Sequence, residues 1–202
     1  MLLRNPSRRT VLVTASAAAA ALAMPGGAFA LTTDQARALI DKLVGEINAV
    51  IASGKSEGAM IKDFERIFSK YADVNFIALS TLGPAARGAN KAVLGDYVTA
   101  FRGYLSRKYG KRFREFIGGA IEVKNAKPVK SYYEVESVAR LRGQAPFDVR
   151  WQVSDKSGRD LFFNLIIEGV NMLSAERTEI GAMLDKRGGD IAALARDLRS
   201  AG

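Results

Sequence analysis

The segment from residue 161 to residue 180 changes its hydrophobic period half-way, and it constrains the fold more than any other part of the chain. Leu161 to Ile167 is rich in β-branched and aromatic residues, which is typical of a strand. From Val170 the apolar positions recur at intervals of three and four residues, which is typical of a helix. Gly169 lies between the two patterns and can bend the backbone without a Cβ clash. The sequence therefore predicts that the last strand of a sheet passes directly into a helix that packs on it.

Three more strands precede this segment, because the hydrophobic period is two from about residue 120 onward. The predicted strands cover residues 120–128, 131–142, 146–154 and 159–168. The turns between the last three are short, as an antiparallel meander requires. Alternation places Val135 and Trp151 on apolar strand faces opposite polar ones. In the last strand Phe163 and Ile167 share one side, and the other side is also apolar, so we expect this strand to be covered on both faces.

Helical patterns flank the strands on both sides. One helix begins after cap candidates at residues 32–34 and ends at Ser53-Gly54. The other predicted helices cover residues 56–71, 76–82, 90 to about 109, 170–186 and 191–198. This order predicts a single α+β domain over residues 31–202, with a four-stranded antiparallel meander sheet and N- and C-terminal helices packed against it.

The first 30 residues have the three regions of an export signal. A basic start is followed by an apolar run over residues 11–24, which is short for a membrane span, and then by Ala28-Phe29-Ala30. Residues 7–12 also resemble a twin-arginine signal. We expect export to the periplasm by the twin-arginine or the general secretory route, with cleavage after Ala30. A membrane anchor or a buried helix is the alternative for this segment.

The chain contains neither histidine nor cysteine, which excludes an imidazole base, a Ser-His-Asp triad and the usual histidine metal sites. No phosphate-binding glycine loop, dinucleotide fingerprint or nucleophile elbow is present. Two glutamate pairs have regular spacing, Glu134 with Glu136 and Glu176 with Glu179. Each pair is predicted to lie on a solvated face and to form salt bridges rather than to do acid–base chemistry. The sequence therefore predicts a protein that is not an enzyme and uses no cofactor.

Large apolar side chains are plentiful: the chain has 10 Phe, 6 Tyr and 1 Trp, and most fall on the apolar faces of the long helix and the sheet. Such faces can pack together as a filled core. They can also leave a gap between the layers, which would bind an oily ligand. The pattern leaves both alternatives open.

Basic residues cluster where the long helix ends, and the whole chain has a formal net charge of +9. A positive surface can attract nucleic acid, an anionic membrane or an acidic partner, but an exported protein does not meet nucleic acid. The cluster is either a solvated face that complements the helix C-terminus or a surface for docking a partner. As a docking surface it would comprise Arg107, Lys108, Lys111, Arg112 and Arg114.

Residues 167–173, Ile-Glu-Gly-Val-Asn-Met-Leu, are followed four residues later by Arg177. They resemble the V-E-G-V-S-L/M-x-x-x-x-R segment of the MlaC or toluene-tolerance family, the periplasmic lipid-binding components of an ABC-type transport system. Further segments resemble that family in the same order: 75–78 with 82–83, 101–105 with Tyr109, 149–153, and 188–190. Together these motifs cover nearly all of residues 31–202.

The resemblance implies a carrier that holds the acyl chains of a phospholipid in a hydrophobic pocket. It also implies exchange of lipid with an inner-membrane ABC transporter complex and an outer-membrane lipoprotein complex. We expect a monomer. The side chains expected to line the pocket are those of Phe64, Phe68, Phe76, Leu79, Phe101, Tyr104, Leu105, Val135, Val149, Trp151, Phe163 and Ile167.

The chain departs from the family's pattern at four points. Ala86 stands where a tryptophan is usual, Asn164 where the last strand usually has Asp, and Glu176 where Tyr or Gln is usual. The last strand also lacks the tryptophan that commonly precedes that Asp. One alternative function is therefore the carriage of a hopanoid or another isoprenoid lipid, with which a subgroup of the family is associated. The other is a periplasmic interaction module whose apolar faces simply pack together.

Overall fold

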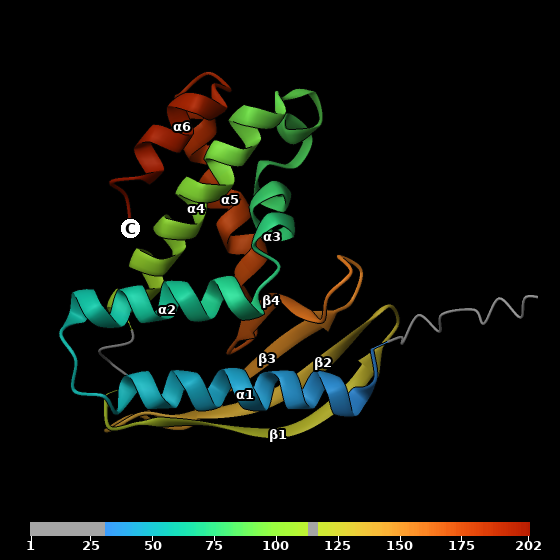
Figure 1. The fold of residues 1–202 in the computed structure, drawn as a ribbon, viewed down its shortest axis with the longest axis vertical. Helices are drawn as coiled ribbons and strands as arrows, with labels where there is room; N and C mark the ends of the chain where they lie inside the picture. The colour runs from blue at the N-terminus through green and yellow to red at the C-terminus, as the bar shows by residue number, and fades with distance from the viewer. Residues whose placement is uncertain (1–30, 113–116) are drawn as a thin grey trace, which may run out of the picture.

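The computed structural model describes residues 31–112 and 117–202, without the side chain of Arg112. The predicted export segment and Arg114 lie outside the described residues. A curved sheet forms one layer, with a helix lying along one of its faces, and a group of four helices forms the other end of the domain (Figure 1). This arrangement confirms the predicted α+β class.

The sheet has five strands in sequence order, each antiparallel to the next. They are β1 (Ala120–Val129), β2 (Tyr132–Arg140), β3 (Phe147–Ser154), β4 (Leu161–Ile167) and β5 (Val170–Asn171). The first four coincide with the predicted meander to within a few residues. The fifth was not predicted, because two residues are too few to show a period.

A tight turn, and not a direct continuation, connects β4 to the following helix. Glu168 and Gly169 have φ values of 49° and 81°, and two successive residues in the left-handed region suit a two-residue hairpin turn. After the turn, Val170 pairs with Ile167 before helix α5 (Met172–Lys186) begins. The predicted direct passage from strand to helix is therefore wrong, although the change of direction is at Gly169 as expected.

Strand β4 contains a bulge that reverses its alternation. Trp151 of β3 is paired with Leu165 and Val153 with Phe162, so Phe163 is the extra residue between the two pairs. Cross-strand partners share a face, and Phe162 therefore lies on the same side as Leu165 and Ile167. The sequence alternation had placed Phe163 there instead. The correction follows from the bulge, because one added residue inverts the side on which all preceding residues lie.

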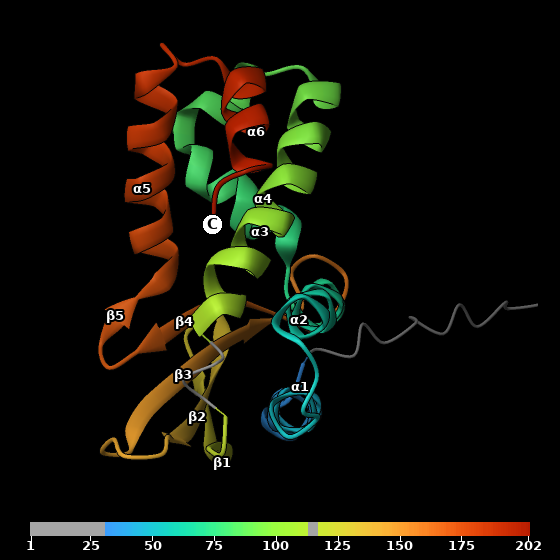
Figure 2. The same cartoon turned by 90° about the vertical axis from the view of Figure 1, so that its left-hand side faces the viewer.

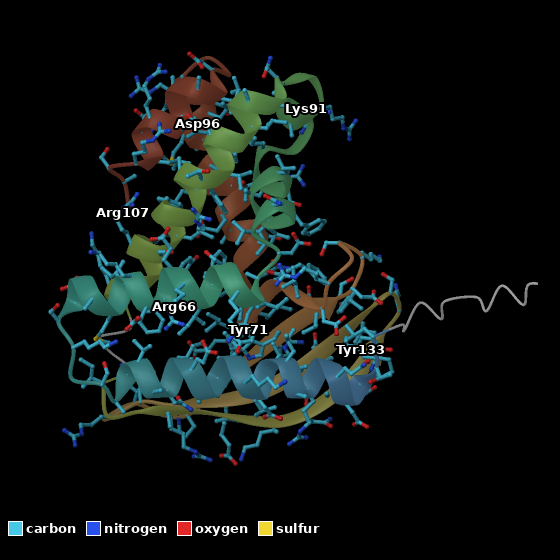
Figure 3. All side chains as sticks on the ribbon, in the orientation of Figure 1. Arg66, Tyr71, Lys91, Asp96, Arg107 and Tyr133 are labelled. Atoms are coloured by element: carbon cyan, nitrogen blue, oxygen red, sulfur yellow. The ribbon has the colours of Figure 1, made fainter. Side chains whose placement is uncertain are left out.

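Helices α1 (Thr33–Ile51) and α2 (Glu57–Tyr71) run next to each other, with α1 on the sheet (Figures 1 and 2). The side chain of Thr32 accepts a hydrogen bond from Gln35 N, and Gln35 returns one to Thr32 N, which completes a capping box at the start of α1. Tyr71 lies between the two helices and donates to Glu46 at 2.8 Å (Figure 3). The hydrogen bond from Tyr71 to Glu46 joins α2 to α1.

The other end of the domain is built by α3 (Val74–Leu82), the 3₁₀ helix η1 (Gly83–Gly88), α4 (Lys91–Arg112), α5 and α6 (Ile191–Leu198). Helix α4 packs on α6 and reaches α2, while α3 packs on α5 (Figure 2). Asp73 and Asp190 cap α3 and α6 with their carboxylates. Among the described residues, no helix combines the length and hydropathy that crossing a membrane would require.

Candidate functional site

A cavity of about 640 Å³ lies between the sheet and helices α2, α4 and α5. Its walls are mainly apolar and come from every layer of the fold: Leu43 from α1, Phe68 from α2, Leu105 from α4, Trp151 from β3 and Leu173 from α5. Volumes of roughly 300–1,000 Å³ are usual for ligand pockets. The sequence left open whether the apolar faces form a filled core or enclose a gap, and the structure shows a gap between the layers.

Seven of the twelve side chains expected to line a pocket do line this cavity. They are Phe64, Phe68, Leu105, Val149, Trp151, Phe163 and Ile167. Six of them lie on apolar stripes of helices or apolar faces of strands that converge on this space. Phe163 is the exception, since it lines the cavity from the bulge and not from the strand face on which alternation had placed it. Their contact with a ligand stays a prediction.

The other five lie outside the lining. Phe101 and Tyr104 are 0% and 2% exposed and pack in the helical core, because they occupy the side of α4 that faces its neighbouring helices. Val135 is fully buried on β2. Leu79 is half-buried on α3, and Phe76 is 47% exposed with its ring edge against Phe163. An apolar helical stripe identifies a buried side chain, but it does not tell a filled core from the wall of a cavity.

Several lining residues were missed by the sequence argument, among them Leu43 and Ile47 of α1 and Leu173 of α5. Leu43 and Ile47 are four residues apart and lie on the apolar stripe of α1, so the sequence did indicate that both side chains are buried. The sequence could not show which apolar helix face borders the cavity. That depends on how the elements cross in space.

The one tryptophan lies in the cavity wall with its polar atom satisfied. Trp151 Nε1 donates to Ser137 Oγ at 2.9 Å, and this hydroxyl in turn donates to the carbonyl of Val149 at 2.9 Å. Ser137 is only 2% exposed. A buried indole N–H without an acceptor would be costly, so Ser137 lets Trp151 present its apolar ring to the cavity.

Asn164 fixes the geometry of the cavity wall by hydrogen bonds. Its side-chain oxygen accepts from the backbone N–H groups of Leu165 and Leu173, and its amide donates to Gln152 and Asn171, all at 2.8 to 3.1 Å. Asn164 also lines the cavity, but all its polar atoms are bonded within the protein. It therefore ties β3, β4 and the start of α5 together.

One side of the cavity is polar and carries a cluster of ionisable groups that joins α4 to α5. Lys108 Nζ donates to Glu176 Oε1 at 2.7 Å, to Glu179 Oε2 at 2.5 Å and to the hydroxyl of Tyr104 at 3.0 Å. Tyr104 donates to Glu179 Oε1 at 2.6 Å, and Tyr109 donates to Glu176 Oε1. Lys108, Tyr109, Glu176 and Glu179 all line the cavity. We call these four with Tyr104 the carboxylate cluster.

The hydrogen bonds of the cluster favour the charged forms of Lys108 and Glu179. Burial lowers the pKa of Lys108, but the hydrogen bonds to Glu176 and Glu179 outweigh it and the pKa is raised above its ordinary value. Burial raises the pKa of Glu179, but bonds from Lys108 and Tyr104 outweigh it and the pKa is lowered. Burial, followed by bonding to the glutamates, raises the pKa of both Tyr104 and Tyr109 well above the ordinary value. The tyrosines are therefore neutral donors.

The predicted solvated position of the glutamate pairs is wrong for one member of each. Glu176 is 3% exposed and Glu134 is 6% exposed. Glu134 lies near Lys127 and Arg150 at 3.5 and 3.7 Å on the sheet, outside the cavity. The hydrophobic pattern assigns a residue to the polar face of its element, but it does not reveal that long neighbouring side chains cover that residue.

The basic residues expected to form one docking surface point to different places. Arg107, labelled in Figure 3, donates to the carbonyls of Leu198 and Ala201. Lys111 donates to that of Gly202 at 2.6 Å. Lys108 belongs to the carboxylate cluster. The side chains of Arg112 and Arg114 lie outside what the structure describes. A docking role stays a prediction, and two of these residues hold the segment after α6 against α4.

A second hollow, of about 730 Å³, lies on the polar face of the sheet. Its lining includes Lys124, Glu136, Asp148 and Arg150, so it does not suit an oily ligand. Within residues 31–112 and 117–202, no group of three carboxylates is placed to hold a metal ion.

Comparison with known proteins gives matches over most of the chain. A family of sequences described as MlaC protein matches residues 37–200. A solved structure of the phospholipid-binding protein from Ralstonia solanacearum, in complex with a phospholipid, superposes with a TM-score of 0.70. The two sequences are 16% identical, and the match covers 82% of this chain and 95% of that one. At this identity the superposition shows a shared fold.

Proposed function

The chain belongs to the MlaC family, and we propose that it binds a phospholipid by its acyl chains in the cavity and carries it between membranes. The observation that carries the proposal is the apolar cavity of about 640 Å³ between the sheet and α2, α4 and α5. The Ralstonia solanacearum protein, which has the same fold, is described as bound to a phospholipid, and this supports the choice of ligand.

The physical chemistry of burial fits a carrier. Each buried methylene gains about 0.8 kcal/mol, so one saturated chain of roughly 16 carbons gains on the order of 10 kcal/mol. Spontaneous release of such a ligand into water is slow. Transfer therefore takes place while the carrier is docked on a membrane or a membrane protein, and no covalent chemistry is needed. We propose a carrier without enzymatic activity and without a cofactor.

We further propose that the carrier works in the periplasm and exchanges lipid with an inner-membrane ABC transporter complex and an outer-membrane lipoprotein complex. Residues 1–30 would act as the export signal, with cleavage after Ala30. The family to which the chain belongs supports this assignment. We propose that the carrier acts as a monomer.

The proposal is tested by native mass spectrometry of the purified protein. The protein is stripped of ligand in organic solvent, refolded, exposed to phospholipid vesicles and separated from them. We expect a stoichiometric complex with the mass of one phospholipid per chain. Absence of any bound lipid, from a protein with native circular dichroism, would contradict the proposal. A bound hopanoid or isoprenoid in material from the native host would replace the phospholipid as cargo.

A further inference from the structure

The charged groups of the cavity are unlike those of the chain as a whole. The chain carries 30 Lys and Arg against 21 Asp and Glu. Of the described residues that line the cavity, one is a cation, Lys108, and three are carboxylates, Glu168, Glu176 and Glu179. Among the described lining residues, negative charge is therefore in excess, although the chain as a whole is basic.

Glu176 is the member of this set that is removed from water. Its side chain is 4% exposed, whereas that of Glu179 is 48% exposed. Glu176 Oε1 accepts hydrogen bonds from Lys108 and Tyr109. Glu176 Oε2 is buried and accepts none from any residue that the structure describes. A buried carboxylate oxygen without a donor is costly, so this atom favours a ligand that brings one.

The neighbours of Glu176 cannot supply the missing donor from their present positions. The three N–H donors of Lys108 are directed to Glu176 Oε1, Glu179 and Tyr104. The hydroxyls of Tyr104 and Tyr109 each donate to a glutamate oxygen. The cluster has thus used its donors, and its remaining capacity is for accepting hydrogen bonds.

We propose that the carboxylate cluster selects lipids whose polar end carries a primary ammonium group, which donates to Glu176 Oε2. This inference rests on the proposed function, because it concerns the polar end of the same bound lipid. A primary ammonium supplies both a positive charge and N–H donors, and charge-assisted hydrogen bonds are about twice as strong as neutral ones. A headgroup whose only charge is a phosphate meets carboxylates and is repelled.

Lipid competition tests the proposal. The ligand-free protein is exposed to vesicles with equal amounts of phosphatidylethanolamine, phosphatidylcholine and phosphatidylglycerol, all with the same acyl chains, and bound lipid is counted by native mass spectrometry. One charged hydrogen bond predicts about tenfold enrichment of the ethanolamine lipid over the glycerol lipid. The choline lipid has the charge but no N–H donor, so it should bind less than the ethanolamine lipid.

Two variants isolate the carboxylate. Glu176→Gln keeps the size of the side chain and removes its charge, and the preference should fall by about tenfold. Glu134→Gln is the matched control, since Glu134 is also buried but lies outside the cavity, and it should keep the preference. If Glu176→Gln does not fold, Glu179→Gln on the exposed side of the cluster should lower the preference in the same direction.

Free ethanolamine distinguishes a lipid site from a site for any small amine. We expect an excess of free ethanolamine to leave loading of the ethanolamine lipid unchanged, because the acyl chains supply most of the affinity; effective competition would overturn the lipid assignment. Equal loading of the three lipids by the wild-type protein would overturn the selectivity while leaving the carrier function standing. A folded protein that loads no lipid at all would overturn both.

Discussion

Trp151 Nε1 and Ser137 Oγ are 2.9 Å apart, and this hydrogen bond connects neighbouring strands beneath the cavity. Both residues are nearly inaccessible to water, with 4% and 2% of their surfaces exposed. The hydroxyl of Ser137 in turn donates a hydrogen bond to the carbonyl of Val149. The largest aromatic side chain of the cavity wall is therefore oriented by a serine that does not touch the cavity.

Ser137→Ala should lower the free energy of unfolding by about 1–3 kcal/mol, because it leaves the indole N–H of Trp151 without an acceptor in a buried site. Urea unfolding followed by tryptophan fluorescence measures this change, since Trp151 is the only tryptophan. Ser69→Ala on the exposed surface of α2 is the control, and it should change stability by less than about 0.5 kcal/mol. Equal effects of the two variants would contradict the role given to Ser137.

Filling the cavity should remove lipid binding without unfolding the domain. Ile167 lines the cavity and is half-buried, so Ile167→Trp places a larger ring in the space that a ligand would occupy. Crowding of about 1–3 kcal/mol corresponds to a loss of affinity between about fivefold and about a hundredfold. Loading is measured by native mass spectrometry.

The neighbouring residue gives the matched control for this experiment. Ile166 is also half-buried on β4, but it is paired with Arg150 and lies outside the cavity lining. Ile166→Trp should therefore load lipid as the wild-type protein does. If both variants lose lipid equally, the cavity is not the binding site.

The contact between Lys108 and Glu179 should give the domain a pH-dependent part of its stability. The pKa of Glu179 is lowered from 4.5, so its stabilising contribution is present above that value and is lost as the pH falls through the lowered pKa. The pKa of Lys108 is raised from 10.5, so the lysine stays charged throughout this acid range. Solvent screens the half-exposed Glu179, so the effect is small.

Melting temperatures between about pH 6 and about pH 3 measure this contribution. The difference between the wild-type protein and Glu179→Gln should shrink as the pH falls. Thr178→Ala, which removes no ionisable group from the next position of α5, should differ from the wild type by the same amount at every pH. A constant difference for Glu179→Gln would show that its carboxylate has no stabilising charge interaction.

Asn164→Leu should destabilise the junction between β4 and α5. It removes the acceptor of two backbone N–H groups and the donor to the side-chain oxygen of Gln152, which costs about 1–3 kcal/mol. Asn171 Oδ1 loses one donor but still accepts from Ser174 N. Hydrogen exchange resolves the effect by position: the amide of Leu173 should exchange faster, while amides of α1 should be unchanged. Uniform acceleration across the domain would indicate global rather than local loosening.

Helices, strands and caps could largely be predicted from the sequence, because each depends on residues that are close together in the chain. The cap at Asp190 and helix α6 over 191–198 are examples: the carboxylate of Asp190 indicates the start of the helix, and the apolar stripe that follows indicates the helix itself. The bulge at Phe163 could not be predicted, because nothing in β4 alone says which partner each residue meets on β3.

The candidate site was predictable in its apolar part only. Phe68 and Trp151 could be assigned to a wall because aromatic residues on a periodic face are buried. The carboxylate cluster depends on α4 and α5 lying together, so that Lys108 meets two glutamates 68 and 71 positions away in sequence. Glu176 differed from the pattern of similar sequences, but its burial could be learned only from the packing of the helices.

The extra residue in β4 makes this strand intolerant of changes in length. Before Phe163 the inward positions are even-numbered, with Phe162 among them, and after it they are odd-numbered, with Leu165 and Ile167. Deletion of Phe163 would restore a regular ladder only if one half of the strand slid by a residue, which would exchange inward and outward side chains along that half. Related sequences should therefore keep the same number of residues between the two pairs.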